Sequence, residues 1–352
     1  MFADHYKMTE NNYIIGTCKG FCPLKEIKLR KSTNLIHYYE KNGKLIKEFT
    51  RSAADRKMEQ PENLRTFEAL KNTLEYLINK IFVDREKPLN FRYDFIFDRC
   101  RAVRQEIVMQ NFTSEKTVEL LEPIVMFLSY SLYRLNSVPI SLFDSKICQQ
   151  HLHECLLKCL SCYEEIDEMN VGKYKMENRI IVEAIHLMLN INDFGTFQRA
   201  IKLNKAIKST FVLGTAIKIS INFHRRHFHK LLHDIQELPH LVGAIASLNL
   251  SQIRKEILRI FSIAYSNQVL KVPLEFIQRL LMYDEQLSLL KHLSDLNIHE
   301  NSDEKETEIG INFNRKKFDN SKSIPNTQQH FVDNKLDDFH LPDLILMKTC
   351  VM

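Results

Sequence analysis

Arginines and acids stand close together in residues 92–107, RYDFIFDRCRAVRQEI, among aromatic and aliphatic residues. Two neighbouring carboxylates, such as those of Asp94 and Asp98, can carry out general acid–base catalysis. Nearby arginines, however, keep carboxylates ionised and therefore make them poor proton donors. If the stretch is helical, Asp98 can pair with Arg101 at a spacing of three residues. We therefore interpret the cluster as structural ion pairs that contain no catalytic residue.

Cysteines at two places have spacings that could hold a metal ion. Cys18 and Cys22 form a C-x-x-x-C motif but lack a second pair at zinc-finger spacing. Cys155, Cys159 and Cys162, with a histidine one turn earlier, could form a site along a helix. Buried thiols on an apolar helix face are commoner, because cysteine behaves as a small hydrophobic residue. Motifs for phosphate loops, dinucleotide binding or a serine nucleophile are also missing. The sequence thus predicts no metal, no cofactor and no enzyme activity.

Positive charge gathers in residues 194–233, which contain no Asp or Glu although an average stretch of this length here would hold about five. The candidate binding residues in this run are Lys218, Arg225, Arg226 and Lys230. A second basic spot is formed by Arg315, Lys316 and Lys317. Such residues can bind the phosphates of single-stranded RNA or DNA with release of counterions. They can also dock an acidic protein partner or form an ordinary solvated face, and the sequence leaves these three alternatives open.

The composition favours helices, because the chain is 44% hydrophobic but has only 8 Gly and 9 Pro. Residues 1–60 show no helical period, and we expect an extended N-terminal arm there. From Pro61 onward, apolar residues recur at three- and four-residue steps, which predicts a helical body over residues 61–267. Within this body, residues 184–194 align with residues 216–226 at an offset of 32. A repeat of about this length indicates an α-solenoid of stacked helix pairs.

The pattern of apolar and polar residues changes over residues 268–340. Two short apolar patterns come first, then an acidic stretch, and then EIGINFNRKKF with strand-like alternation. Two helices followed by a β-hairpin predict a winged-helix module, with the second basic spot on its wing. Residues 319–335 are polar and predict a loop. The tail, residues 341–352, is expected to dock back as a short helix or strand.

The N-terminus lacks the basic lead-in and apolar run of a secretory signal. Every apolar stretch falls short of the roughly 20 residues that cross a bilayer. We therefore expect a location inside the cell, no membrane association and mostly reduced cysteines.

Several blocks of the sequence resemble, in order, the signature blocks of the GANP family, which comprises the germinal-centre-associated nuclear protein and the yeast suppressor-of-actin scaffold. The blocks are GTCKGFCPLKEIKLR (16–30), KEFTRSAADRKMEQPENLRTFEALKNTLEYLINKIF (47–82), RYDFIFDRCRAVRQEI (92–107) and FDSKICQQHLHECL (143–156). The resemblance implies a PCI-like fold that ends in a winged helix and acts as a scaffold in nuclear mRNA export, without an active site. It also implies two partners, a second PCI-type protein and a small acidic subunit, and a location in nucleus and cytoplasm.

Two departures from the family pattern matter. The large members carry Phe-Gly repeats before this region and a centrin-binding helix after it, and this sequence has neither, so we expect no centrin binding. The short, single-domain architecture resembles the SAC domain-containing subgroup, which is linked to centrosome duplication and the spindle. An adaptor of the centrosome or spindle in mitosis is therefore the alternative function.

The residues that match the family blocks define a structural motif rather than a reaction site. We expect them to fasten the N-terminal arm to the first helices. They are Arg51, Asp55, Leu64, Arg65, Tyr93, Asp94, Asp98, Arg99, Arg101 and Arg104.

Overall fold

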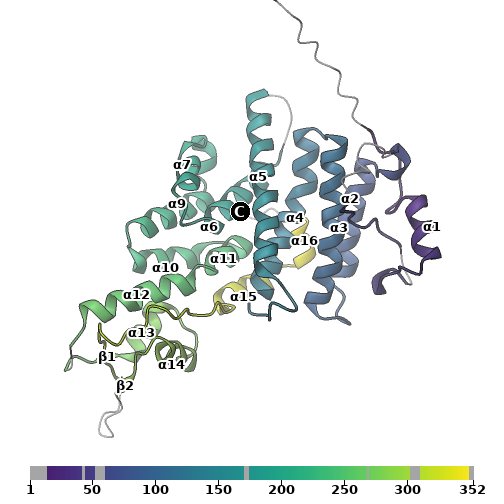
Figure 1. Ribbon diagram of the computed structural model, residues 1–352. Coiled ribbons are helices and arrows are strands. Elements are labelled where there is room, and N and C mark those ends of the chain that lie inside the picture. Colours follow the sequence, from purple (N-terminus) through teal and green to yellow (C-terminus); the bar gives the residue numbers. More distant parts are fainter. Residues whose placement is uncertain are drawn as a thin grey trace, which may run out of the picture. The chain divides into compact units, whose positions relative to one another are not determined.

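The computed structural model describes residues 14–41, 44–51, 60–169, 174–267, 269–301 and 310–348, and the fold is mainly α-helical, as the sequence predicted (Figure 1). The first helices are α1 (Leu24–Ser32), the 3₁₀ turns η1 (Tyr38–Glu40) and η3 (Pro61–Asn63), α2 (Phe67–Tyr76), the π-helix η4 (Leu77–Phe82) and α3 (Leu89–Gln110). Two long helices follow, α4 (Ser114–Leu135) and α5 (Ser145–Met169).

The next helices are α6 (Met176–Leu189), α7 (Phe194–Lys202), α8 (Lys205–Lys208), α9 (Phe211–His224), α10 (Phe228–Glu237), α11 (His240–Ser247) and α12 (Leu250–Ala264). The C-terminal elements are β1 (Val272–Pro273), α13 (Leu274–Leu281), α14 (Gln286–Asp295), β2 (Glu300–Asn301), β3 (Gly310–Ile311), α15 (His330–Asp337) and α16 (Leu341–Ile345). Contacts group the chain into two compact units. The first holds the residues up to Ile124 together with Ser161–Tyr174, and the second holds Val125–Leu160 and the residues from Lys175 onward.

Helix α2 of the first unit begins six residues later than the sequence suggested. Pro61 starts a 3₁₀ turn, and the N-cap of α2 is Thr66, whose hydroxyl accepts a hydrogen bond from the Ala69 N–H. Leu70 and Leu74 then point into the core, and the π-helix η4 continues the same chain segment and packs against α3. The amphipathic pattern therefore located the helix correctly but not its first residue.

The N-terminal arm is not extended throughout, because α1 lies inside it. Helix α1 carries exposed leucines, Leu24 and Leu29, and the one side chain that it buries is Arg30. A helix whose buried residue is an arginine has no apolar period, so hydrophobic periodicity could not detect it.

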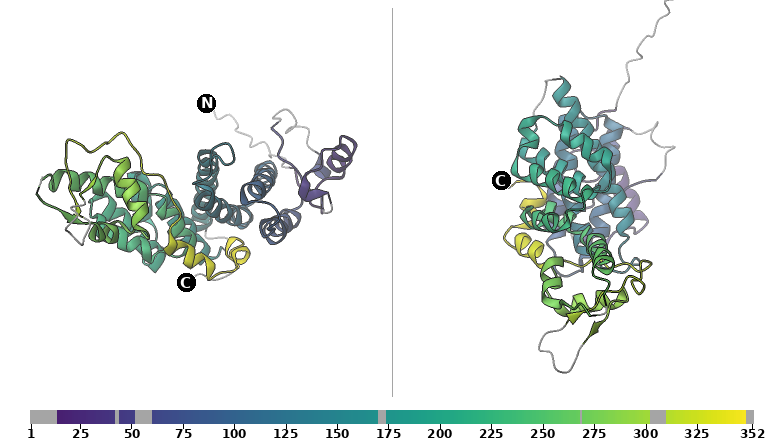
Figure 2. Two further views of the ribbon diagram at one scale, coloured as in Figure 1. Left: turned by 90° about the horizontal axis from the view of Figure 1, so that it is seen from below. Right: turned by 90° about the vertical axis from the view of Figure 1, so that its left-hand side faces the viewer.

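The second unit contains the helix pairs predicted from the internal repeat. Helices α6 and α7 form one pair, α9 and α10 form the next, and α6 packs against α9 (Figure 1 and Figure 2). Ala184 and Ala216, which coincide in the alignment at offset 32, are both fully buried on equivalent helices. A small residue at each position allows close approach of the packed helices, so the sequence repeat is also a structural repeat.

After α12 the chain forms a small module of two helices, α13 and α14, and a three-stranded antiparallel sheet in the order β1-β3-β2. Strand β3 pairs on both sides, since Ile311 lies opposite Val272 of β1 and Glu300 of β2. The β2–β3 pair joins Glu300–Asn301 to Gly310–Ile311, whereas the sequence had placed a hairpin over residues 308–318 with its end at Arg315 to Lys317; these three residues instead form a turn after β3. Strand β1 was not predicted, because two residues are too short a segment to show alternation.

The last segment returns to the helical body. The predicted loop 319–335 was wrong at its end, since α15 begins at His330 and packs on α11. The hydroxyl of Tyr133 in α4 accepts a hydrogen bond from the Gln329 N–H (2.8 Å) and donates one to Asp333 (2.8 Å). Buried Arg254 of α12 donates to the Gln329 side chain (2.9 Å). These polar anchors act together with the buried Val332 and Leu336 of α15 to hold the segment in place, and α16 is the short helix expected in the tail. No helix in the described parts of the chain is both long and apolar enough to span a bilayer.

Candidate functional site

Four basic side chains of the second unit form the candidate site, which we call the basic surface: Lys218, Arg225, Arg226 and Lys230. Lys218 is on α9, the two arginines follow its end, and Lys230 is in the first turn of α10. All four are exposed. Lys218 and Arg225 are seven residues apart, which places them two turns apart on one side of the helix. Because α9 and α10 pack against each other, the four residues belong to one helix pair.

Arg226 differs from the other three residues of the basic surface. It has a left-handed backbone, with φ of 58°, and its guanidinium forms a 3.2 Å ion pair with Glu256 of α12. Glu256 also binds Arg259 at 2.7 Å, and the hydrogen bond and charge of Arg259 lower the pKa of Glu256. Within the described ranges, Lys218, Arg225 and Lys230 have no acidic partner. The positive charge available to a ligand therefore comes mainly from these three.

Exposed aromatic rings, which the sequence reasoning overlooked, lie in the same stretch. Phe194 and Phe211, the first residues of α7 and α9, have exposed fractions of 55% and 65%. The Phe194 ring contacts those of Phe197 and His224 at centroid distances of 5.7 and 5.8 Å. Aromatic rings beside cationic side chains are the arrangement on which single-stranded nucleic acids stack their bases. The sequence did contain a signal for these rings, because the aromatic residues lie inside the stretch that has no Asp or Glu.

The second basic spot, Arg315 to Lys317, is exposed and forms a turn after β3. The Arg315 N–H donates to the Ser266 hydroxyl (3.1 Å), just beyond the end of α12. Arg226 contacts α12 through Glu256, ten residues earlier. At the helical rise of 1.5 Å per residue, the two attachment points are roughly 15 Å apart along α12. The β2–β3 hairpin tip, where a wing would end, lies outside the described residues.

The family motif occupies the first unit, where charged side chains join the N-terminal segment to α3. Buried Arg99 of α3 pairs with Glu40 (3.1 Å), Glu48 (3.0 Å) and Asp98 (2.7 Å). Arg30 of α1 also binds Glu40 and pairs with Glu48 at 3.1 Å. Burial by itself would raise the pKa of Glu40, but the hydrogen bonds that it accepts and the two arginines lower it. The network therefore holds Glu40 ionised in the core.

A second buried ion pair lies about two turns further along α3, at Glu106. The Arg65 backbone N–H (2.6 Å) and its guanidinium (2.9 Å) donate to Glu106, and Lys47 lies 3.5 Å from the same carboxylate. Gln110 donates to the Arg65 carbonyl (2.9 Å) and accepts from the Gly16 N–H (2.8 Å). A Cβ at Gly16 would lie 2.6 Å from the Arg65 carbonyl oxygen, so only glycine allows this approach.

The motif residues found from sequence thus have different environments. Tyr93, Arg65 and Arg99 are buried, while Asp94 and Arg51 are exposed. Leu64 is buried and Arg104 is half-buried. The guanidinium carbon of Arg101 lies 3.7 Å from the centroid of the Phe49 ring. Asp55 lies outside the described residues. The ion pair seen for Asp98 is with its neighbour Arg99, whereas the helical spacing had suggested Arg101.

Sequence reasoning missed the partners of this motif, namely Arg30, Glu40, Glu48, Glu106 and Gln110. Glu106 and Gln110 could have been found, because they follow the apolar face of α3 at helical spacing. The acids of residues 40–48 gave no such signal, since their segment has no regular period.

The cysteines lie in places that favour packing. Cys155, Cys159 and Cys162 of α5 are almost fully buried. Burial also raises the pKa of the Cys22 thiol, and the Cys18 thiol donates to the Gly20 carbonyl at 3.6 Å. Over the residues that the structure describes, no three or more His, Cys, Asp or Glu side chains come together as a metal site.

Comparison with known proteins gives a consistent assignment. The model of the SAC3/GANP family matches residues 21–302. Protein xmas of Drosophila melanogaster is 32% identical over 165 residues, which are 43% of this chain and 8% of that protein. SAC3 family protein 1 of Schizosaccharomyces pombe is 24% identical over 94% of this chain and 35% of that protein. SAC3 family protein B of Arabidopsis thaliana is 29% identical over 35% of this chain and 8% of that protein. The chain therefore spans only a minor part of the length of these relatives.

Proposed function

Because the chain belongs to the SAC3/GANP family, we propose that it is a non-catalytic helical scaffold that assembles protein partners in nuclear mRNA export. The observation that carries this proposal is the family match over residues 21–302. The stacked helix pairs support it, since helical repeats offer extended surfaces to partners. The proposed location is the nucleus and cytoplasm.

We also propose roles for two parts of the second unit. The module of α13, α14 and the small sheet has the elements of a winged helix, which would end a PCI-like solenoid. Such an end is suited to pairing with a second PCI-type protein, with a small acidic subunit as the third component. The basic surface would then contact RNA that the assembly carries, mainly through phosphates.

The test of the scaffold proposal is affinity purification of the intact protein from cells, with its RNA retained. We expect a second PCI-type protein, a small acidic subunit and polyadenylated RNA in the purified complex. Centrosomal or spindle proteins without RNA would overturn the export role and support the alternative adaptor function. A variant with Glu106→Ala, which breaks the core of the first unit, serves as the control for specific recovery.

The basic surface should give a salt-dependent affinity for single-stranded RNA. Each lost phosphate contact lowers the slope of log affinity against log salt by about 0.7, so Arg225→Ala with Lys230→Ala should flatten the slope by roughly 1.4. Adding Arg226→Ala should bring the change to at most about 2, because Glu256 already neutralises part of that charge. Fluorescence anisotropy of a labelled oligonucleotide at several salt concentrations, with purified protein alone, measures these slopes.

The matched control removes two exposed lysines from α1 of the first unit, Lys28→Ala with Lys31→Ala. It changes the net charge equally, and the slope should stay as in the wild type. Failure of the wild type to bind RNA even at low salt would instead assign the basic surface to an acidic protein partner.

A further inference from the structure

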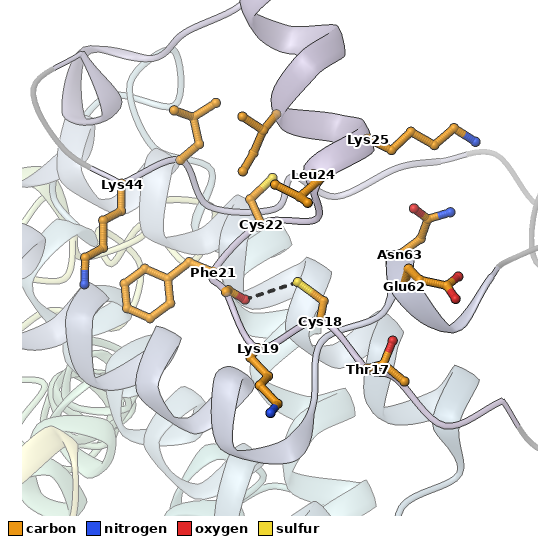
Figure 3. Close-up of a pocket in the computed structure, with 13 residues that line it drawn as sticks. Thr17, Cys18, Lys19, Phe21, Cys22, Leu24, Lys25, Lys44, Glu62 and Asn63 are labelled. Atoms are coloured by element: carbon orange, nitrogen blue, oxygen red, sulfur yellow. Dashed lines mark hydrogen bonds between the residues drawn. The ribbon is translucent and has the colours of Figure 1, made fainter.

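A pocket of about 830 Å³ opens on the first unit and has no part in the functions described above (Figure 3). Its walls come from the segment 17–22, the start of α1, the residues Lys44 and Leu45, and the turn at Glu62 and Asn63. These parts are held by the buried ion pairs of Arg30 and Arg65, so the pocket is formed by a fixed framework.

The inner wall of the pocket is apolar. Phe21, Leu24, Ile27 and Leu45 line it, together with the buried thiol of Cys22. Leu24 is 74% exposed although it is a large hydrophobic residue that lines the pocket. An exposed leucine in such a place is suited to contact with an apolar side chain of a ligand.

The rim of the pocket is positive. Lys19, Lys25 and Lys44 line it, against the single acid Glu62. Lys44 is held alongside the Phe21 ring, with its ammonium 4.6 Å from the ring centroid, as Figure 3 shows. The acid of α1, Glu26, does not offset this charge, because it accepts the Glu48 N–H at 2.9 Å and is directed into the first unit. Glu62 is therefore the one exposed acid among the residues that line the pocket, against three exposed lysines.

We propose that this pocket binds a short acidic segment of a partner protein. One apolar side chain of the segment would lie against Leu24 and Phe21, and flanking carboxylates would meet the lysines of the rim. A nucleic-acid strand fits less well, since the aliphatic lining residues offer no ring for base stacking and the one aromatic ring among the lining residues, Phe21, already carries Lys44. This proposal concerns the first unit and is independent of RNA binding by the second.

The experiment selects random twelve-residue peptides, displayed on phage, against the full-length protein at physiological salt. Enriched peptides should carry one bulky apolar residue flanked by Asp or Glu. A labelled copy of the most enriched peptide is then measured by fluorescence anisotropy. Leu24→Ser and Lys25→Glu should each weaken its binding at least fivefold.

Two neighbours on α1 provide matched controls. Leu29 and Lys28 are exposed on the same helix but do not line the pocket, so Leu29→Ser and Lys28→Glu should change binding less than twofold. All four positions are exposed, and equal melting temperatures will establish that the variants are folded. Equal weakening by the pocket variants and their controls, or no enrichment of acidic peptides over the Leu24→Ser/Lys25→Glu double variant, would overturn the proposal. RNA binding should be unaffected by the pocket variants, which separates this test from that of the basic surface.

Discussion

Replacing Glu106 with alanine is expected to lower the free energy of unfolding of the first unit by about 3–5 kcal/mol. Glu106 is 1% exposed and lies against the guanidinium of Arg65, which is fully buried, and the ammonium of Lys47. The variant leaves both cations in the core without their carboxylate, and it also removes the acceptor of the Arg65 backbone N–H. Urea unfolding followed by circular dichroism measures the loss.

An exposed ion pair of the same unit gives the control. Lys71 and Glu119 are 2.6 Å apart, but both side chains are more than 40% exposed, so Glu119→Ala should cost less than about 1 kcal/mol. Replacing the buried pair as a whole, with Arg65→Met and Glu106→Leu, should recover part of the stability because no charge is then left unpaired. A Glu106→Ala variant as stable as Glu119→Ala would show that the pair does not hold this unit together.

Lowering the pH from 7 to 4.5 should destabilise the second unit by roughly 2 kcal/mol for each of two buried histidines. Burial, reinforced by Arg199 and His153, lowers the pKa of His186 to about 4, with Asp193 opposing it weakly. Burial and the charge of Lys335 lower the pKa of His240 to about 4. Between pH 6.5 and 4, these two histidines are protonated in the unfolded chain but mostly neutral in the folded chain. Stability from these groups is therefore complete above pH 6.5 and falls as the pH drops.

The variant His186→Phe keeps an aromatic ring without a titrating group, so the loss of stability between pH 7 and 4.5 should shrink by roughly 2 kcal/mol. His229→Phe, at an exposed position of α10, should leave the pH profile of the wild type unchanged. Urea unfolding at a series of pH values provides the comparison. A profile of His186→Phe that is as steep as that of the wild type would show that His186 is not the group responsible.

The sequence by itself determined the helical class and the helix pairs of the second unit. These features follow from apolar residues repeating every three or four positions, which is local information. The offset of 32 residues located α6 and α9 because both bury the same face, including Ala184 and Ala216. The family blocks also contained Arg99 of α3 and Arg65, which precedes α2, and both are buried in ion pairs.

Only the tertiary structure decided which charged side chains remain available to bind a ligand or partner. Arg226 looked equivalent to Arg225 in sequence, but Glu256, thirty residues away, neutralises part of its charge. Arg30 is buried against Glu40 and makes α1 a helix without an apolar face, although Lys28 and Lys31 beside it are exposed. Whether a charged side chain faces solvent or the core depends on an opposite charge that can lie anywhere in the chain. The spacing of residues along the sequence predicts which side chains share a face of one helix. Which charged side chains pair with each other depends on how distant segments of the chain fold together.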